Sequence, residues 1–251
     1  MSETPPPPPP PNLTPPPGYA GYQPTNWDSS LRAVSGVAKW ISVLLVISAV
    51  MSLISLATAP SVRNAARDYL ETRDENSFND SLALWGITGL ITAALSIALV
   101  VLSIIWLYRV SSNHRTLGRA LTWAPGWAIG GWFLPPLLYV IPLLVLREAW
   151  KAANPAAPSG SQTWKSEGGE NPWIWVWFLV YSIAPLVIAA AGATSFAVGN
   201  DTETVAKRFA DHFGPVLAQS AFAIAAAAAW FLVVRQLSHR HAQFTGELTA
   251  R

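Results

Sequence analysis

Hydrophobic and polar positions along this chain are separated into long blocks. Four runs free of charged residues cover residues 40–59, 82–107, 173–198 and 216–234. A helix rises 1.5 Å per residue, so roughly 20 residues cross a hydrocarbon core about 30 Å thick. The pattern therefore predicts an all-α fold, a membrane helix bundle with four transmembrane helices.

A fifth apolar run, residues 127–146, is interrupted by Gly130, Gly131, Pro135, Pro136 and Pro142. Proline lacks a backbone N–H and disfavours helical geometry in the residue before it. The arm before the proline pair would reach only about 12 Å, well short of the core thickness. This predicts a central re-entrant segment that turns at these residues. The alternative is one kinked crossing, which would make five transmembrane helices.

The basic residues favour the re-entrant layout. If the N-terminus is cytoplasmic and residues 127–146 do not cross, the inner segments hold eleven Lys and Arg and the outer segments five. If the segment crosses, the same orientation gives seven inside and nine outside. An excess of Lys and Arg in cytoplasmic loops sets membrane orientation, so the N-terminus is predicted to be cytoplasmic.

The segments outside the bundle differ in composition. Residues 1–26 are a proline tract with little to bury, which predicts a disordered cytoplasmic tail able to dock a partner in polyproline form. The bundle is predicted over residues 27–238, beginning with a short surface helix that carries Leu31 and Val34, and residues 239–251 form a C-terminal cytoplasmic tail. The outer segments 60–81 and 199–215 hold eight acids against five bases. Their helical periodicity at 61–73 and 203–213 predicts surface helices.

Composition supports a multi-pass membrane protein. Hydrophobic residues make up 51% of the 251 residues, charged residues only 12%, and there are 13 Trp. The absence of cysteine excludes disulfides and thiolate metal sites. No ionisable residue lies inside the five apolar runs, which argues against proton relays, voltage sensors and most ion-coupled transporters.

The run "WLYRVSSNHRTLG", followed by "APGWAIGGWFLP" and "REAW", resembles an uncharacterised family of bacterial, mainly actinobacterial, membrane proteins catalogued as domain of unknown function 4328. The matching positions are Arg109, Asn113, Pro125 to Phe133, Pro135, Pro142, Glu148 and Trp150. The resemblance implies a location in the bacterial plasma membrane and a multi-pass layout. It brings no known activity.

One group of residues is a candidate contact for anionic lipid or another anionic ligand. Basic side chains near the cytoplasmic surface attract lipid phosphates. Arg109 and Asn113 share a helix face at a spacing of four. The group consists of Arg109, Asn113, Arg115, Arg147 and Lys151.

No catalytic, cofactor or metal constellation is visible. His239 and His241 would point apart on a helix, so they do not predict a metal site. The sequence favours a non-catalytic membrane protein that organises partners or senses lipid, in contact with the bilayer and with the capacity to form homo-oligomers, and without nucleic acid as a partner. Two alternatives stay open: a passive channel or transporter that uses the broken segment 127–146, and an enzyme acting on lipid headgroups at Arg109, Asn113 and His114.

Overall fold

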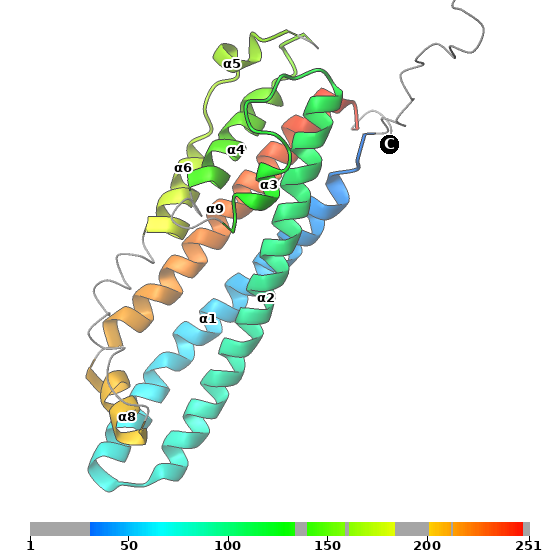
Figure 1. The fold of residues 1–251 in the computed structure, drawn as a ribbon. Coiled ribbons are helices and arrows are strands. Elements are labelled where there is room, and N and C mark those ends of the chain that lie inside the picture. The colour runs from blue at the N-terminus through cyan, green and yellow to red at the C-terminus, as the bar shows by residue number, and fades with distance from the viewer. Residues whose placement is uncertain (1–30, 134–139, 159–160, 184–200, 212, 248–251) are drawn as a thin grey trace, which may run out of the picture. The chain divides into compact units, whose positions relative to one another are not determined.

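The computed structural model describes residues 31–133, 140–158, 161–183, 201–211 and 213–247. Within these ranges the regular elements are all helical, so the all-α prediction is confirmed for this part of the chain (Figure 1). In chain order they are α1 (Ser35–Thr72), α2 (Glu75–Thr116), α3 (Trp127–Gly130), α4 (Val140–Ala152), α5 (Trp164–Glu167), α6 (Pro172–Phe178), the π-helical turn η1 (Leu179–Ile183), α8 (Thr202–Asp211) and α9 (Phe213–Thr245).

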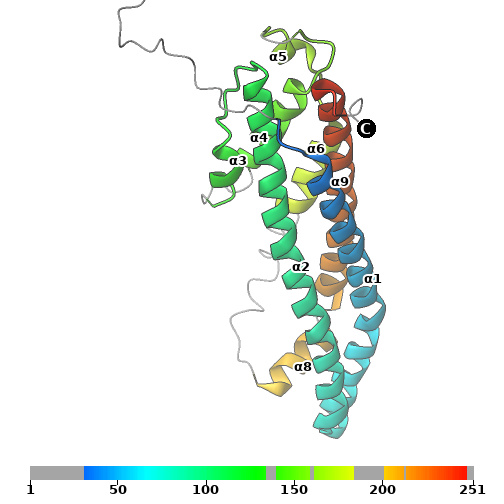
Figure 2. The same cartoon turned by 90° about the vertical axis from the view of Figure 1, so that its right-hand side faces the viewer.

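Three of these helices, α1, α2 and α9, are long and apolar enough to cross a membrane. They contain the predicted spans 40–59, 82–107 and 216–234, and α1 packs along both other helices (Figure 2). The remaining predicted span, 173–198, begins in α6 and η1 and continues into residues outside the described ranges. The described helices therefore define a multi-pass membrane protein.

The segment 60–81, expected as a loop with a surface helix, is mostly part of the two long helices. α1 continues through Pro60 to Thr72, and Arg73, at φ 62°, makes the turn into α2. The extension is stabilised by packing, because Ala66 and Tyr69 are buried against Phe78 and Ala206. The second expected outer helix is α8, which contacts α1.

The predicted surface helix at the start of the bundle is wrong for its first described residues. Residues 31–34 are not helical, and α1 begins at Ser35. Here the side chain of Asn113 bonds to both backbone groups of Arg32, which holds this segment against α2 ahead of the first turn of α1.

The central segment approaches itself closely. A Cβ placed on Gly131, just after α3, would lie 2.5 Å from Cγ2 of Ile141 in α4. Only glycine at position 131 allows this approach. Pro142 lies inside α4, and the helix continues beyond it to Ala152, so this proline does not end the helix. Pro135 and Pro136 lie outside the described residues.

The interior of the bundle is rich in tryptophan. Trp106 and Trp230 pack edge to face, and their indole N–H groups donate to Ser238 at 2.9 Å and Ser103 at 3.1 Å. Trp132 lies against Trp177 with 6.2 Å between ring centroids. On α9, Ala229 is buried, whereas Ala221, Ala223 and Ala225 are exposed.

Candidate functional site

The described helices separate charge between their two ends. One end contains the start of α1, the last turns of α2 and α9, and the segment from α4 to α6. It holds ten described Lys and Arg against four Glu, and we call it the basic end. The acidic end, formed by the turn between α1 and α2 together with α8, holds five Lys and Arg against eight Asp and Glu.

Two of the predicted site residues bind the chain's own backbone. Asn113 accepts a hydrogen bond from the Arg32 N–H and donates one to the Arg32 carbonyl, each at 2.9 Å. Arg109 donates to the carbonyl of Ala33 at 2.8 Å. The helical spacing of four does place both on one face of α2, as predicted. Their side chains hold the segment before α1 against α2.

Asn113 also begins a buried chain of hydrogen bonds. Its Nδ2 lies 3.1 Å from Nε2 of His241, and Nδ1 of His241 lies 3.1 Å from Nε2 of His114. Because the amide nitrogen of Asn113 is a donor, Nε2 of His241 must accept, and its Nδ1 must carry the proton that is donated to His114. Both rings are then neutral, with the His114 proton on Nδ1. All three side chains are almost completely buried.

Arg119 is a buried cation satisfied by carbonyl groups. Its side chain is 1% exposed, and its guanidinium donates to the carbonyls of Asn154, Ala157 and Pro158 at 2.9 to 3.1 Å. The guanidinium also lies over the ring of Phe244, 4.5 Å from its centroid. Arg119 therefore fixes the loop that follows α4.

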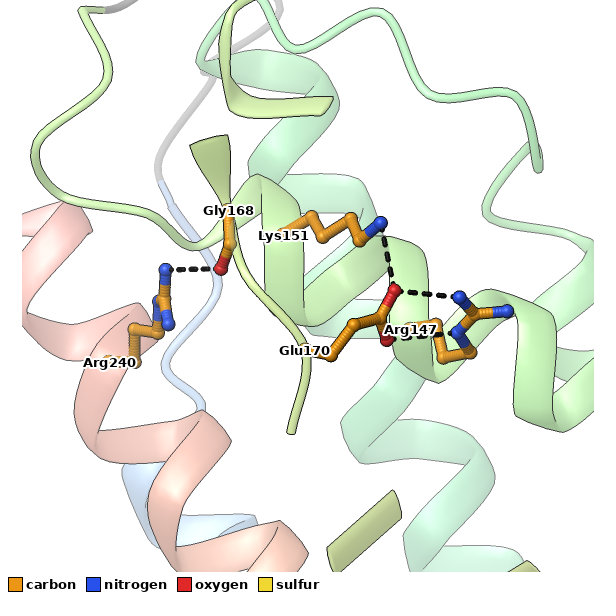
Figure 3. Close-up of polar contacts among 5 residues, drawn as sticks. All are labelled: Arg147, Lys151, Gly168, Glu170 and Arg240. Atoms are coloured by element: carbon orange, nitrogen blue, oxygen red, sulfur yellow. Dashed lines mark hydrogen bonds and ion pairs between the residues drawn. The ribbon is translucent and has the colours of Figure 1, made fainter. Parts of the chain in front are cut away.

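Arg147 and Lys151, on successive turns of α4, share one carboxylate (Figure 3). Arg147 donates from Nε and Nη2 to the two oxygens of Glu170 at 3.0 and 2.6 Å, and Lys151 Nζ lies 2.9 Å from one of them. Hydrogen bonding from Arg147, and then from Lys151, lowers the pKa of Glu170 to about 2. Arg147 also lies over the ring of Trp175, at 4.9 Å.

The loop between α5 and α6 reaches this site because of a glycine. A Cβ at Gly168 would lie 2.6 Å from Cα of Lys151. At this distance any side chain at position 168 would force the backbone to shift. The carbonyl of Gly168 accepts from Arg240 at 2.9 Å (Figure 3), and Arg240 lies over the ring of Trp150. This contact joins α9 to the loop that carries Glu170.

Glu148 and Trp150 of the "REAW" motif have structural contacts. Glu148 accepts from the backbone N–H groups of Thr122 at 2.6 Å and Trp123 at 2.9 Å, which orders the segment before α3. Trp150 supports Arg240. Glu148 therefore joins α4 to the segment before α3, and Trp150 joins α4 to α9.

The five predicted contact residues thus fall into two groups and one separate residue. Arg109 and Asn113 meet at the start of α1, and Arg147 and Lys151 meet at Glu170, while Arg115 is exposed. Sequence reasoning missed Glu170, Gly168 and the pairing of His114 with His241. Nothing local signals a contact between residues 127 apart in the chain. Among the described residues, no group of three or more His, Cys, Asp or Glu could hold a metal ion.

With regular elements that are all helical in the described residues, three of them able to span a bilayer, the chain belongs to the class of multi-pass membrane proteins. More particularly, the chain is a member of the family described as Domain of unknown function (DUF4328), which matches residues 67–239. That range includes Asn113, Arg147, Glu170 and most of the described helices. No curated protein and no solved structure matches the chain.

Proposed function

We propose that this protein is a non-catalytic protein of the bacterial plasma membrane that binds anionic lipid headgroups at its basic end and organises partners there. The observation that carries the proposal is that Arg147 and Lys151 share a single carboxylate, that of Glu170. Two cations facing one acid leave a positive charge, which a lipid phosphate would neutralise. Each basic residue near an anionic surface contributes about 1 kcal/mol of attraction.

The aromatic residues beside this site suit the headgroup layer. Trp173 and Trp175 in α6, and Trp127 at the start of α3, are each 37% to 39% exposed, and Trp40 near the start of α1 is 64% exposed. Indole rings favour the membrane interface. Their presence at the basic end supports a position in which Arg147 and Lys151 lie among lipid phosphates.

The orientation follows from the same charges. Ten basic residues against four acidic ones at the basic end, compared with five against eight at the acidic end, favour a cytoplasmic basic end. In this orientation the N-terminus is cytoplasmic, and the proline tract of residues 1–26 is available to bind a protein partner.

We further propose four spans around a re-entrant segment. Gly131 and Ile141 are ten residues apart, which in a continuous helix would separate them by about 15 Å. Their close approach instead supports a reversal of the chain between them. A turn of this kind within a membrane requires surrounding protein. On the two arms of the segment, Ala128 and Ile141 belong to the main buried cluster and pack against protein.

The buried histidines favour a non-catalytic role over a headgroup enzyme. His114 would be the natural general base of such an enzyme, yet its side chain is fully buried beside His241 and Phe244. A group that transfers protons must reach the substrate directly or through one water. The packing around His114 supports a structural contribution instead.

Lipid binding can be tested with the full-length protein in nanodiscs that contain brominated phosphatidylglycerol or brominated phosphatidylcholine. We expect stronger quenching of tryptophan fluorescence by the anionic lipid, and loss of most of this preference in the double variant Arg147→Gln, Lys151→Gln. The matched control, Arg67→Gln with Lys207→Gln, removes the same charge from the acidic end. Equal quenching by both lipids in the wild type would overturn the proposal.

The layout can be tested by single cysteines in this naturally cysteine-free chain. Cysteine can replace Ser77 in the turn region between α1 and α2, Gln162 before α5, or Gln243 near the end of α9. All three positions are exposed. With an impermeant maleimide on intact cells, we expect labelling at residue 77 alone. Labelling at 162 and 243 as well would mean that residues 127–146 cross the membrane.

A further inference from the structure

A cavity of about 210 Å³ lies within the bundle, between α1, α2, α9 and the α6–η1 segment. Its walls combine serine and threonine hydroxyls with aromatic rings, and none of the described residues that line it is charged. Ser48, Ser52, Thr92 and Ser96 provide hydroxyls, and Trp132 and Trp177 provide rings. These hydroxyls belong to the central parts of the uncharged runs 40–59 and 82–107, so the cavity lies at the depth of the hydrocarbon core.

Two of the hydroxyls around the cavity, those of Thr92 and Ser96, have already used their hydrogen. Ser96 donates to the carbonyl of Thr92 at 2.9 Å, and Thr92 donates to the carbonyl of Thr88 at 2.8 Å. Ser103 accepts from the indole of Trp230. These are contacts within the protein, so these groups do not require a ligand.

Two buried polar atoms of residues that line the cavity have no such contact. Oγ of Ser48 and Nε1 of Trp132 are inaccessible to solvent and have no hydrogen-bond partner among the described residues. Both groups can donate a hydrogen bond, and an indole N–H can do nothing else. A buried donor left unpaired costs about 1 to 3 kcal/mol. An oxygen acceptor on a bound molecule would remove this cost.

The size and walls of the cavity limit what it can hold. A dry cavity of about 150 Å³ in another protein accepts benzene, so this larger cavity suits one or two fused rings. Trp177 stacks on Tyr181 with centroids 5.4 Å apart and lies 4.7 Å from Trp230, which forms an aromatic wall. Because the described lining holds no cation or acid to compensate a charge at this depth, a charged ligand would be strongly disfavoured.

We infer that this cavity is a binding site for an uncharged, lipid-soluble ring compound that carries a carbonyl oxygen. The ring packs against Trp177 and the neighbouring aromatic side chains. The carbonyl accepts from Ser48, whose hydroxyl turns about χ1 from its enclosed position into the cavity. The ligand enters from the bilayer, so this site is separate from the headgroup site at Arg147 and Lys151.

The test uses two small probes of nearly equal size, 1-tetralone, which has a ring carbonyl, and tetralin, which lacks it. The full-length protein in nanodiscs is heated with each probe, because a ligand that binds the folded state raises the unfolding temperature. We expect tetralone to raise this temperature by several degrees and tetralin to raise it by less than half as much. Equal shifts from the two probes, or no shift, would overturn the inference.

Substitutions locate the binding. Ser48→Ala should reduce the tetralone shift toward that of tetralin, whereas Ser42→Ala, which removes a hydroxyl already bonded to the carbonyl of Ala38, should leave it unchanged. Ala226→Leu fills the cavity from α9 and should abolish both shifts. If this variant does not fold, Ser96→Leu fills the cavity from an exposed position on α2. Ala94→Leu, also exposed on α2, is the control. Shifts that persist in the filled variants would place the probes elsewhere and reject the site.

Discussion

The two ends of the described bundle use polar residues in different ways. At the basic end, Asn113, His114, His241 and Arg119 are buried, and their side chains bond to backbone groups or to one another. At the acidic end, Arg73 and Lys207 pair with Glu203 on the surface. Buried groups lose most of their contact with water, so unpairing them is costly, whereas surface pairs exchange easily with solvent. Substitutions of polar residues should therefore lower the stability more at the basic end than at the acidic end.

The largest effect is expected for Asn113→Ala. This change removes two hydrogen bonds to Arg32 and one to His241, and it leaves the Nε2 acceptor of His241 without its partner. We expect the free energy of unfolding to fall by about 2 to 4 kcal/mol. Denaturation of the purified protein in detergent measures this change. The neighbouring variant Thr116→Ala, at an exposed position, should have little effect, and a similar loss in both would contradict the explanation.

Gly168→Ala should have the next largest effect. Its Cβ would meet the backbone of Lys151 at 2.6 Å, so the loop must move away from α4. Overpacking of this kind costs about 1 to 3 kcal/mol. The control is Gly126→Ala, where the added Cβ meets nothing within 4 Å. If the two variants have the same thermal midpoint, the close approach of loop and helix is not required for stability.

A smaller effect is expected for Glu170, whose side chain is 42% exposed. Its pKa is lowered in the folded state, from 4.5 to about 2, so its stabilising contribution is complete above pH 4.5 and is lost as the pH falls toward 2. Glu170→Gln should cost less than about 1 kcal/mol at neutral pH because water screens the pair. It should also flatten the acid limb of a stability profile measured from pH 6 to 2. An unchanged acid limb would mean that other carboxyl groups control it.

The smallest effect is expected at the acidic end, for Glu203→Gln. Arg73, followed by Lys207, lowers the pKa of Glu203 to about 2, yet the ion pairs are exposed to solvent. We expect the same thermal midpoint as the wild type at low and at high salt, measured by circular dichroism. A midpoint shift as large as that of Gly168→Ala would show that the acidic end is not a simple surface.

The sequence predicts the three described membrane helices, α1, α2 and α9, well because each is a local property of an uncharged run. The extension of α1 through Pro60 was not predicted, since it depends on Tyr69 packing against Phe78, which a reading of either run alone does not reveal. The basic residues of the candidate site were identified from charge. Their partners were not, because Glu170 reaches Arg147 only through a loop whose path depends on Gly168.

The length of α1 has a further consequence. Twelve residues follow Pro60 within this helix, which corresponds to about 18 Å beyond the uncharged run. The headgroup layer occupies only roughly 5 to 8 Å on each side of the core. The turn at Arg73 and Asp74 is therefore held in water at a fixed height by two continuous helices. A fluorophore attached at this turn would report the thickness of the surrounding bilayer, because its distance from the lipid headgroups would shorten as the bilayer thickens.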